Sequence, residues 1–375
     1  MTPNVTRRDL LRAAAGSAML AAAPARAATE GGQGLGAIAA ERGLLFGSWI
    51  RETSLFDNPA YAEMMARECR LIVSALEMHW DSVEPEQGVD DFKLPDAALG
   101  WAKAHGQKFR GHALVWGERA PKWFASLSGR DAAIRALRDH IRRVCGHFAG
   151  QMQSWDVVNE AIQTYSGRPD KLRRTVFLDK IGPEYLDIAF TAAREADPHA
   201  LLVLNEFGVE FEIEDSAEKR ATLLGLVDGF KKRGTPIDAI GVQSHLQTRW
   251  MPHFDPRAFG AFLDEIAGRG LKILLTELDV ADRSAPSDIA VRDAEVAATY
   301  KRYLDAALAH QAVIAAITWG LTDGDSWVTR GDLPAFRRTD GLPPRPLPFD
   351  QNYRPKPAYF AIAEALHAAP MRRPD

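Results

Sequence analysis

The chain has 375 residues, of which 46% are hydrophobic and 26% charged, and its formal net charge at pH 7 is −4. This composition is typical of a globular protein with a large core, and it allows one large domain or two average ones. The mildly acidic charge, with no long basic run, argues against nucleic acid or an anionic membrane as a partner and suits an uncharged substrate.

Residues 1–27 have the pattern of a twin-arginine export signal. Arg7 and Arg8 precede an apolar run over residues 13–23, which is shorter than the ~20 apolar residues that a membrane-spanning helix needs. The small residues that follow predict cleavage after Ala27. An amphipathic N-terminal helix is the alternative interpretation. The signal predicts a mature protein that is periplasmic or secreted and that has no segment inserted in a membrane.

From Gly43 onward, short apolar runs alternate with longer stretches of helical periodicity, such as residues 131–148. The runs begin near Leu44, Leu71, Phe109, Trp155, Leu201, Ile237, Leu271 and Val313. Strand–helix alternation predicts a parallel sheet, and eight such units predict an α/β fold of the closed (β/α)8 type, a TIM barrel, in a single domain. A doubly wound open sheet is the alternative, although no Gly-rich phosphate loop follows the first run.

The two cysteines, Cys69 and Cys145, both have apolar neighbours. The chain has no CxxC motif and no Cys/His cluster, so we expect neither a metal site nor another cofactor. A single disulfide and two separate buried thiols both fit an oxidising compartment.

Polar or aromatic residues close six successive predicted strands, from the third to the eighth. They are His112 and Trp116, Asn159 and Glu160, Asn205 and Glu206, Gln243 and His245, Glu277 and Asp279, and Trp319. The active site of a (β/α)8 barrel lies at the carboxyl ends of its strands. We therefore expect these side chains to meet at one end of the barrel.

Glu160 and Glu277 close the fourth and seventh strands, on opposite sides of the expected barrel mouth. A glycosidase that retains anomeric configuration uses two carboxyl groups about 5–5.5 Å apart, one as proton donor and one as nucleophile. The donor needs a raised pKa, which burial and a neighbouring negative charge supply. Each residue also has a structural interpretation, because Asn159 or Glu160 can cap a helix and Glu277 can pair with a buried arginine.

Several motifs together resemble glycoside hydrolase family 10, the endo-β-1,4-xylanases, from about Gly43 to Leu366. The motifs are "GHALVW", "WDVVNEA", "GVQSHL", "TELDV", "TWG" and "PKPAY". The resemblance implies a retaining, endo-acting enzyme that hydrolyses internal β-1,4 bonds of xylan. It divides the chain into the export signal 1–27, a lead-in 28–42, a catalytic domain 43–368 and a tail 369–375. The implied partner is a polysaccharide or oligosaccharide, and we expect a monomer.

The resemblance also implies roles for the residues that cleave the bond. Glu160 matches the general acid/base and Glu277 the nucleophile. Asn159 matches the amide that bonds the 2-hydroxyl of the sugar being cleaved. His245 and Asp279 match the pair that orients the nucleophile.

Other residues match groups that hold sugars. Gln243 lines the subsite of the cleaved sugar, and His112 and Trp116 grip that sugar from the third strand. Trp319 and Trp327 match aromatic platforms, which suit the apolar faces of pyranose rings. A satisfied core histidine is the alternative for His112 and for His245, and core packing is the alternative for Trp116 and Trp319.

The second strand departs from the family pattern. The Glu-Asn pair that usually ends this strand is replaced by Ala75 and Leu76, and the Lys that follows is replaced by His79. Those polar groups hold sugars on the glycone side, the non-reducing side of the cleaved bond, so their loss changes substrate preference. His79 and Phe207, which stands where Tyr is common, are the substrate-binding residues that differ from the pattern.

Three other functions compete with an endo-xylanase. The same retaining mechanism can act on a different β-linked glycan, such as a bacterial exopolysaccharide or a β-glucan. A carbohydrate-binding barrel without catalysis is disfavoured by the presence of both Glu160 and Glu277. A metal-dependent hydrolase using His79, His112 and His245 lacks the usual ligand spacing.

Overall fold

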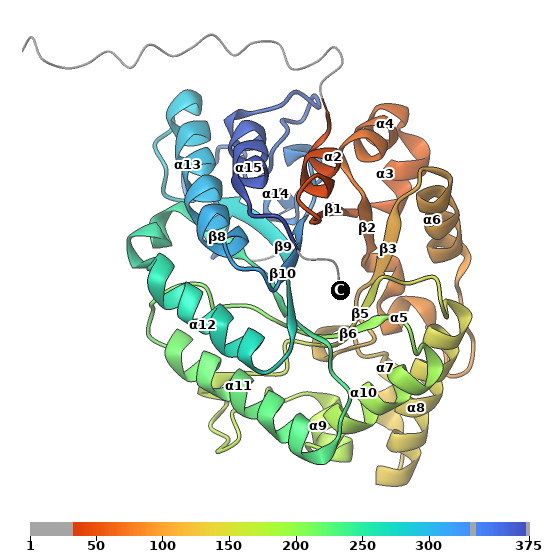
Figure 1. Cartoon of the computed structure of the whole chain (residues 1–375). Coiled ribbons are helices and arrows are strands. Elements are labelled where there is room, and N and C mark those ends of the chain that lie inside the picture. The colour runs from red at the N-terminus through yellow and green to blue at the C-terminus, as the bar shows by residue number, and fades with distance from the viewer. Residues whose placement is uncertain (1–32, 331–334, 373–375) are drawn as a thin grey trace, which may run out of the picture. The chain divides into compact units, whose positions relative to one another are not determined.

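A closed ring of parallel strands occupies the centre of the fold, with helices around it (Figure 1). The computed structural model describes residues 33–330 and 335–372. The strands are β1 (Leu45–Ile50), β2 (Leu71–Ser74), β3 (Lys108–Gly111), β4 (Val115–Trp116), β5 (Ser154–Asn159), β6 (Leu201–Glu206), β7 (Ala239–Val242), β8 (His245–Gln247), β9 (Lys272–Ala281) and β10 (Val313–Thr318). Every pairing is parallel, and β10 pairs with both β1 and β9. This closure confirms the predicted (β/α)8 barrel and rules out an open sheet.

Two of the eight predicted strands are each divided into two short strands. In the third position β3 and β4 both pair with β5, and in the sixth position β7 and β8 both pair with β9. The break between β7 and β8 falls at Ser244, whose φ of 63° lies in the left-handed region that interrupts a strand. The N–H of Ser244 leaves the ladder and donates to the side chain of Glu210.

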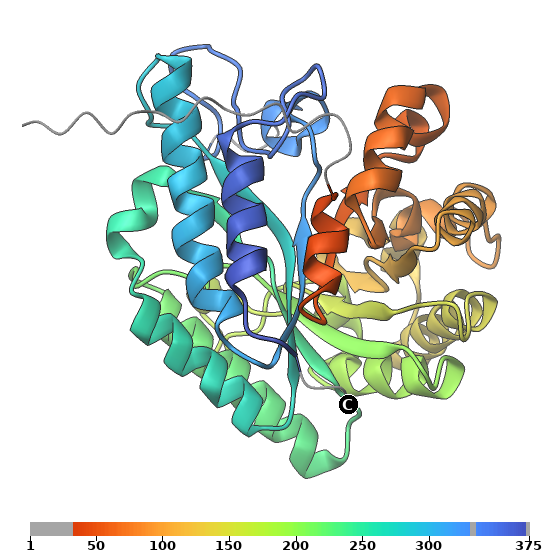
Figure 2. The ribbon, with the colours of Figure 1, turned by 45° about the horizontal axis from the view of Figure 1, so that its top comes forward.

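Helices cover the outside of the ring. The α-helices are α2 (Leu35–Ala40), α3 (Glu52–Asp57), α4 (Pro59–Glu68), α5 (Trp80–Val83), α6 (Lys93–Ala104), α7 (Lys122–Ser126), α8 (Arg130–His147), α9 (Val176–Ile181), α10 (Tyr185–Ala196), α11 (Ser216–Arg233), α12 (Pro256–Gly268), α13 (Ile289–Leu308), α14 (Trp327–Arg330) and α15 (Pro357–Ala368). Short 3-10 turns are η1 (Leu76–Met78), η2 (Gly117–Arg119), η3 (Thr164–Ser166), η4 (Thr248–His253) and η5 (Asp323–Asp325). Figure 2 shows α13 and α15 side by side against the strands.

The helix ends follow local sequence signals. The Asp255 side chain accepts hydrogen bonds from the first N–H groups of α12, and Asp288 does the same for α13. Proline occupies the first position of α12 and of α15, where its missing N–H costs no hydrogen bond. Gly234, with φ of 74°, ends α11 in the left-handed conformation that glycine adopts without a steric cost.

The hydrophobic core has two parts, one on each side of the strands. The larger part lies between strands and helices, and includes Phe109, Trp155 and Leu204. The smaller part fills the inside of the barrel, and includes Val73 and Leu274. The sheet is apolar on both faces, which explains why its strands read as near-continuous apolar runs in the sequence.

The ends of the described chain pack onto the barrel. Helix α2 lies within the segment expected as a lead-in, and its Leu35 is fully buried. At the other end, Arg372 is buried and donates hydrogen bonds to the carbonyl oxygens of Leu308 and Val313. Cys69 and Cys145 are separate buried thiols.

The predicted export signal, residues 1–27, lies outside the described residues. Within the described ranges, no helix has the length and apolar character needed to cross a membrane.

Candidate active site

The two predicted catalytic carboxylates lie where strands end at the same rim of the barrel. Glu160 follows β5 directly, Glu277 lies in β9, and the side chains of the two are 15% and 6% exposed. Glu160 has a φ of 57°, a conformation that residues other than glycine rarely adopt. Its N–H donates to the carbonyl oxygen of Asn205 on β6 (2.9 Å). This backbone conformation sets the direction in which the Glu160 side chain leaves the strand.

Amide side chains connect the two carboxylates. Asn205 Nδ2 donates to Asn159 Oδ1 (2.9 Å) and to Glu277 Oε1 (2.7 Å). Gln243 Nε2 lies 3.2 Å from Asn159 Oδ1 and 3.4 Å from Glu160 Oε1. The structure thus brings Asn159, Gln243 and both glutamates together. Asn205, which makes the link to Glu277, was expected at this rim from its place at the end of a strand, but no role was predicted for it.

The pKa of Glu160 lies above its ordinary value. Burial is the largest cause, and the negative charges of Glu206 and Glu277 add to it. The guanidinium of Arg173 and the hydrogen bond from Gln243 act in the opposite direction. The expected raised pKa is confirmed, together with its two expected causes. Such a carboxyl group keeps its proton closer to neutral pH and is suited to donate it.

His245 lies between two carboxylates on β9. Its Nε2 is 3.2 Å from Glu277 Oε2, and its Nδ1 is 3.1 Å from Asp279 Oδ1. Burial lowers the pKa of His245, but the charges of Asp279 and Glu277 outweigh burial and hold that pKa well above its ordinary value. The contact with His245 fixes the position of the Glu277 carboxyl group. Trp327 Nε1 donates to Asp279 Oδ2 (2.5 Å), so a predicted aromatic platform is anchored to the same group.

Two further buried acids fix the loops that carry these side chains. Glu206 accepts a hydrogen bond from the N–H of Ile162 (2.7 Å), two residues after Glu160, and pairs with Lys219 Nζ (2.8 Å). Glu210 accepts from the N–H of Ser244, the residue before His245. Burial raises the pKa of Glu210. Both acids accept hydrogen bonds from backbone N–H groups next to site residues. No sequence motif predicts this role.

His112 is held by a buried polar cluster behind the rim. Its Nδ1 is 2.8 Å from Asp156 Oδ2 on β5, and Asp156 also pairs with Arg110 on β3. Burial lowers the pKa of His112, but the hydrogen bond to Asp156 and the charge of Glu277 raise it above its ordinary value overall. His112 is therefore a positioned polar group near Glu277, and Asp156 and Arg110 were missed because both lie within apolar strands.

Aromatic side chains line the rim between the carboxylates and the third strand. The ring of His112 is 5.2 Å from that of Trp319 and 6.0 Å from that of Trp116. The ring of His245 is 6.5 Å from Trp319 and 5.0 Å from Trp327. The predicted aromatic residues therefore form one continuous lining with the two histidines.

Phe207 follows β6 and lies beside two cations. Lys219 Nζ is 3.5 Å from the centre of its ring, and the Arg173 guanidinium is 5.6 Å away. The Phe207 ring is partly exposed. Lys219 occupies a position over the ring, so only part of the ring surface is open to a sugar.

The altered loop after β2 contributes few polar groups to the rim. Ala75 is fully buried in the apolar cluster inside the barrel, and Leu76 packs against that cluster. His79 is 3% exposed, and neither of its ring nitrogens has a hydrogen-bond partner among the described residues. Its ring is 5.5 Å from His112 and 5.3 Å from Trp116. Burial, followed by the charges of His112 and Arg119, holds the pKa of His79 well below its ordinary value, so this imidazole is neutral.

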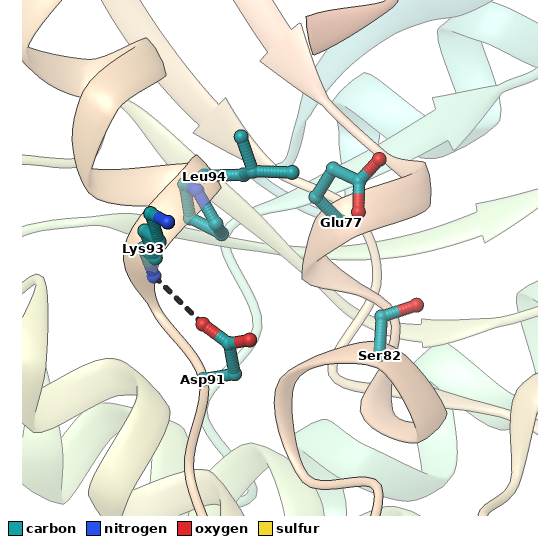
Figure 3. A pocket seen from close by; sticks show the side chains of 6 residues that line it. Glu77, Ser82, Asp91, Lys93 and Leu94 are labelled. Carbon is teal, nitrogen blue, oxygen red and sulfur yellow. Dashed lines mark hydrogen bonds between the residues drawn. The ribbon is translucent and has the colours of Figure 1, made fainter. Parts of the chain in front are cut away.

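A hollow of about 320 Å³ lies beside the same loop. Figure 3 shows Glu77 and Ser82 on one side of it and Asp91, Lys93 and Leu94 on the other. None of the predicted site residues lines this hollow. In the part of the chain that the structure describes, no group of three or more His, Cys, Asp or Glu side chains is arranged to hold a metal ion.

Comparison with known proteins identifies related sequences and folds. The model of the family described as glycosyl hydrolase family 10 matches residues 34–365. Endo-1,4-beta-xylanase B of Thermotoga neapolitana is 34% identical over 319 residues, which cover 84% of this chain and 85% of that protein. Endo-1,4-beta-xylanase 5 of Pyricularia oryzae is 32% identical over 351 residues, covering 92% and 82%. The crystal structure of native xylanase 10B from Thermotoga maritima matches with a TM-score of 0.78 at 31% identity, covering 89% of this chain and 98% of that one.

Proposed function

The chain belongs to glycosyl hydrolase family 10, and we propose that it is an endo-1,4-β-xylanase that cleaves internal bonds of xylan with retention of configuration. The observation that carries this proposal is the pair of buried glutamates joined through Asn159, Asn205 and Gln243. Relatives named as endo-1,4-beta-xylanases support xylan as the substrate.

In the first step, Glu277 attacks the anomeric carbon while Glu160 gives its proton to the leaving glycosidic oxygen. The C–O bond to the leaving sugar breaks as the bond to the Glu277 carboxylate forms. Burial and neighbouring negative charge raise the pKa of Glu160, which suits it to this role. His245 holds the attacking carboxylate in place from its other side.

In the second step, Glu160 acts as a base toward water. Its carboxylate takes a proton from the water molecule whose oxygen attacks the anomeric carbon, and the ester bond to Glu277 breaks. Two displacements at one carbon restore the original configuration. This is the reason for expecting retention.

The surrounding polar groups bind the sugar at the cleaved bond. Asn159 lies beside both glutamates, where its amide can bond the 2-hydroxyl, and Gln243 lies at the same position. His112, held by Asp156, approaches from the third strand. His79 packs beside His112 and Trp116, so its buried imidazole shapes the wall of this part of the site.

The aromatic groups supply flat apolar surfaces for pyranose rings. Trp319 and Trp327 flank His245, and Trp116 lies beside His112 and His79. Phe207, which follows β6, offers the exposed part of its ring.

One observation favours a second candidate, the same mechanism on a different β-linked glycan such as an exopolysaccharide or a β-glucan. Ala75 is buried and Leu76 is apolar and partly exposed at the positions where the family pattern has hydrogen-bonding groups on the glycone side. A site without those groups discriminates sugars differently.

Export through the twin-arginine route to the periplasm or the exterior is part of the proposal. The paired Arg7 and Arg8, the short apolar run and the small residues before Ala27 support it. We also propose that the mature enzyme is a monomer with no segment inserted in a membrane.

The test combines stereochemistry with substrate range. Proton NMR during hydrolysis of an aryl β-xylobioside should show the β-anomer first, with the α-anomer appearing only by mutarotation. Product profiles on xylan, mixed-linkage glucan and cellulose identify the preferred polymer. Initial formation of the α-anomer would contradict the mechanism, whereas higher kcat/KM on a glucan would select the second candidate.

A further inference from the structure

The loop that follows Glu160 folds back against it. The N–H of Arg173 donates to the carbonyl oxygen of Ala161 (2.7 Å), and the N–H of Gln163 donates to that of Lys171 (2.8 Å). Ile162 and Leu172 form an antiparallel bridge between these two bonds. The backbone thus holds Arg173 in register with Glu160.

The Arg173 side chain contacts Glu160 at two points. Its Nε donates to the backbone carbonyl oxygen of Glu160 (2.8 Å), and its Nη2 lies 3.4 Å from Glu160 Oε2. The side chains of Arg173 and Glu160 are 13% and 15% exposed, so water screens this pair only partly. One guanidinium therefore fixes both the strained backbone and the carboxyl group of the proposed proton donor.

We propose that Arg173 is a positioning residue that prepares Glu160 for its second role, as the base of the deglycosylation step. The inference rests on the proposed function, because it assigns Glu160 both proton transfers. Nothing in the family resemblance assigned a role to Arg173.

The charges that face Glu160 come from three other segments. Glu206 on β6 and Glu277 on β9 are negative and raise the pKa of Glu160, and Arg173 lowers it. Lys219 pairs with Glu206, and His245 pairs with Glu277. Gln243 contributes a neutral hydrogen bond.

Formation of the glycosyl-enzyme changes this balance. Glu277 becomes an ester and loses its negative charge, whereas Arg173 keeps its positive charge beside Glu160. The pKa of Glu160 therefore falls between the two steps, and Arg173 supplies the positive charge that stabilises the carboxylate needed to deprotonate water. Without Arg173, Glu160 would keep its proton to a higher pH, so less of it would be the carboxylate that deprotonates water near neutral pH.

The experiment compares Arg173→Met with wild type on 2,4-dinitrophenyl β-xylobioside. This leaving group needs little protonation, so deglycosylation limits turnover. We expect kcat at neutral pH to fall about tenfold and KM to fall in parallel, because the glycosyl-enzyme accumulates. On xylan, the alkaline limb of the kcat/KM profile should move up by about one pH unit, since an opposite charge at this distance lowers a carboxyl pKa by roughly that amount or more.

Two further variants distinguish the effect of the positive charge of Arg173 from a general effect of changing this loop. Arg174→Met is the matched control, because Arg174 lies in the same loop, is exposed, and bonds the carbonyl oxygen of Ser166 instead. It should leave both profiles unchanged. Arg173→Lys keeps the positive charge and should return the alkaline limb toward the wild-type position even if its melting temperature drops.

The outcomes are distinguishable. Two results would overturn this inference and leave the proposed function standing. One is that Arg173→Met keeps wild-type turnover and the wild-type alkaline limb of its pH profile. The other is that Arg173→Lys moves the alkaline limb as far as Arg173→Met does. Absence of wild-type turnover on every aryl β-glycoside overturns the proposed function and this inference with it. If Arg173→Met does not fold, Arg173→Lys and Arg173→Gln, checked by circular dichroism, provide the same comparison.

Discussion

The two sides of the barrel mouth differ in how their polar groups are satisfied. Around the scissile bond, the oxygens of Glu277 accept from Asn205 and His245, and Glu160 faces Gln243 and Arg173. On the glycone side, the loop after β2 contributes apolar side chains and the imidazole of His79, whose nitrogens have no partner among the described residues.

We therefore assign the two regions separate roles, bond cleavage to the first and sugar recognition to the second. Both ring nitrogens of His79 are buried, and a buried polar atom without a partner costs about 1–3 kcal/mol. The side chains at the scissile bond are held by hydrogen bonds to one another. The loop after β2 contributes mainly apolar side chains, so we expect it to affect which sugar is bound and not how the bond is cleaved.

The largest expected loss of activity comes from removing Glu277, the proposed nucleophile at the scissile bond. Glu277→Ala should lower kcat on xylan about 10⁴-fold or more, because no covalent intermediate can form. Azide fits the space left by the carboxylate and should restore part of the turnover on an activated aryl glycoside, with a glycosyl azide of inverted configuration as the product. Retained activity without azide would show that another group attacks the sugar.

Removal of the proton donor should have a smaller effect that depends on the substrate. Glu160→Ala should lower kcat/KM on xylan about 10²–10⁴-fold, because the natural leaving sugar requires protonation. On a 2,4-dinitrophenyl glycoside the first step should be nearly unaffected. Loss of the alkaline limb of the pH profile is the second readout, since the raised pKa of Glu160 sets that limb. Equal losses on both substrates would argue against Glu160 as the acid.

The sequence predicted the fold well because each strand is a short apolar run closed by polar residues. It also predicted Asn159, Gln243, His245 and Asp279 near the two glutamates, because motifs carry these residues at strand ends. The resemblance to a family added their expected roles.

Other parts of the site depend on geometry that no short motif contains. Asn205 bridges Asn159 and Glu277 only because β6 lies between β5 and β9 in the ring. Arg173 reaches Glu160 only because the intervening loop folds back on itself. Long-range pairing and loop conformation are set by tertiary packing, so the sequence pattern alone could not reveal these contacts.

The smallest effect is expected when the polar residues of the family pattern are put back into the loop after β2. This change tests whether that loop determines substrate preference. The change is Ala75→Glu with Leu76→Asn and His79→Lys, which returns the residue types of the family pattern. Each hydrogen bond regained with the substrate should raise kcat/KM on xylan about two- to tenfold, since one such bond contributes about 0.5–1.5 kcal/mol. Ala75 is fully buried, so the melting temperature should fall because a charged group enters an apolar cluster.

The two opposed effects make the result informative. An aryl β-xyloside with a single sugar is the internal reference, because Ala75 and Leu76 should act on sugars beyond the cleaved one. If kcat/KM rises on xylan but not on this reference, the cleft is that of a xylanase that has lost part of its sugar clamp. If xylan activity falls while the variant remains folded, the apolar character of this loop is itself part of the recognition of a different glycan.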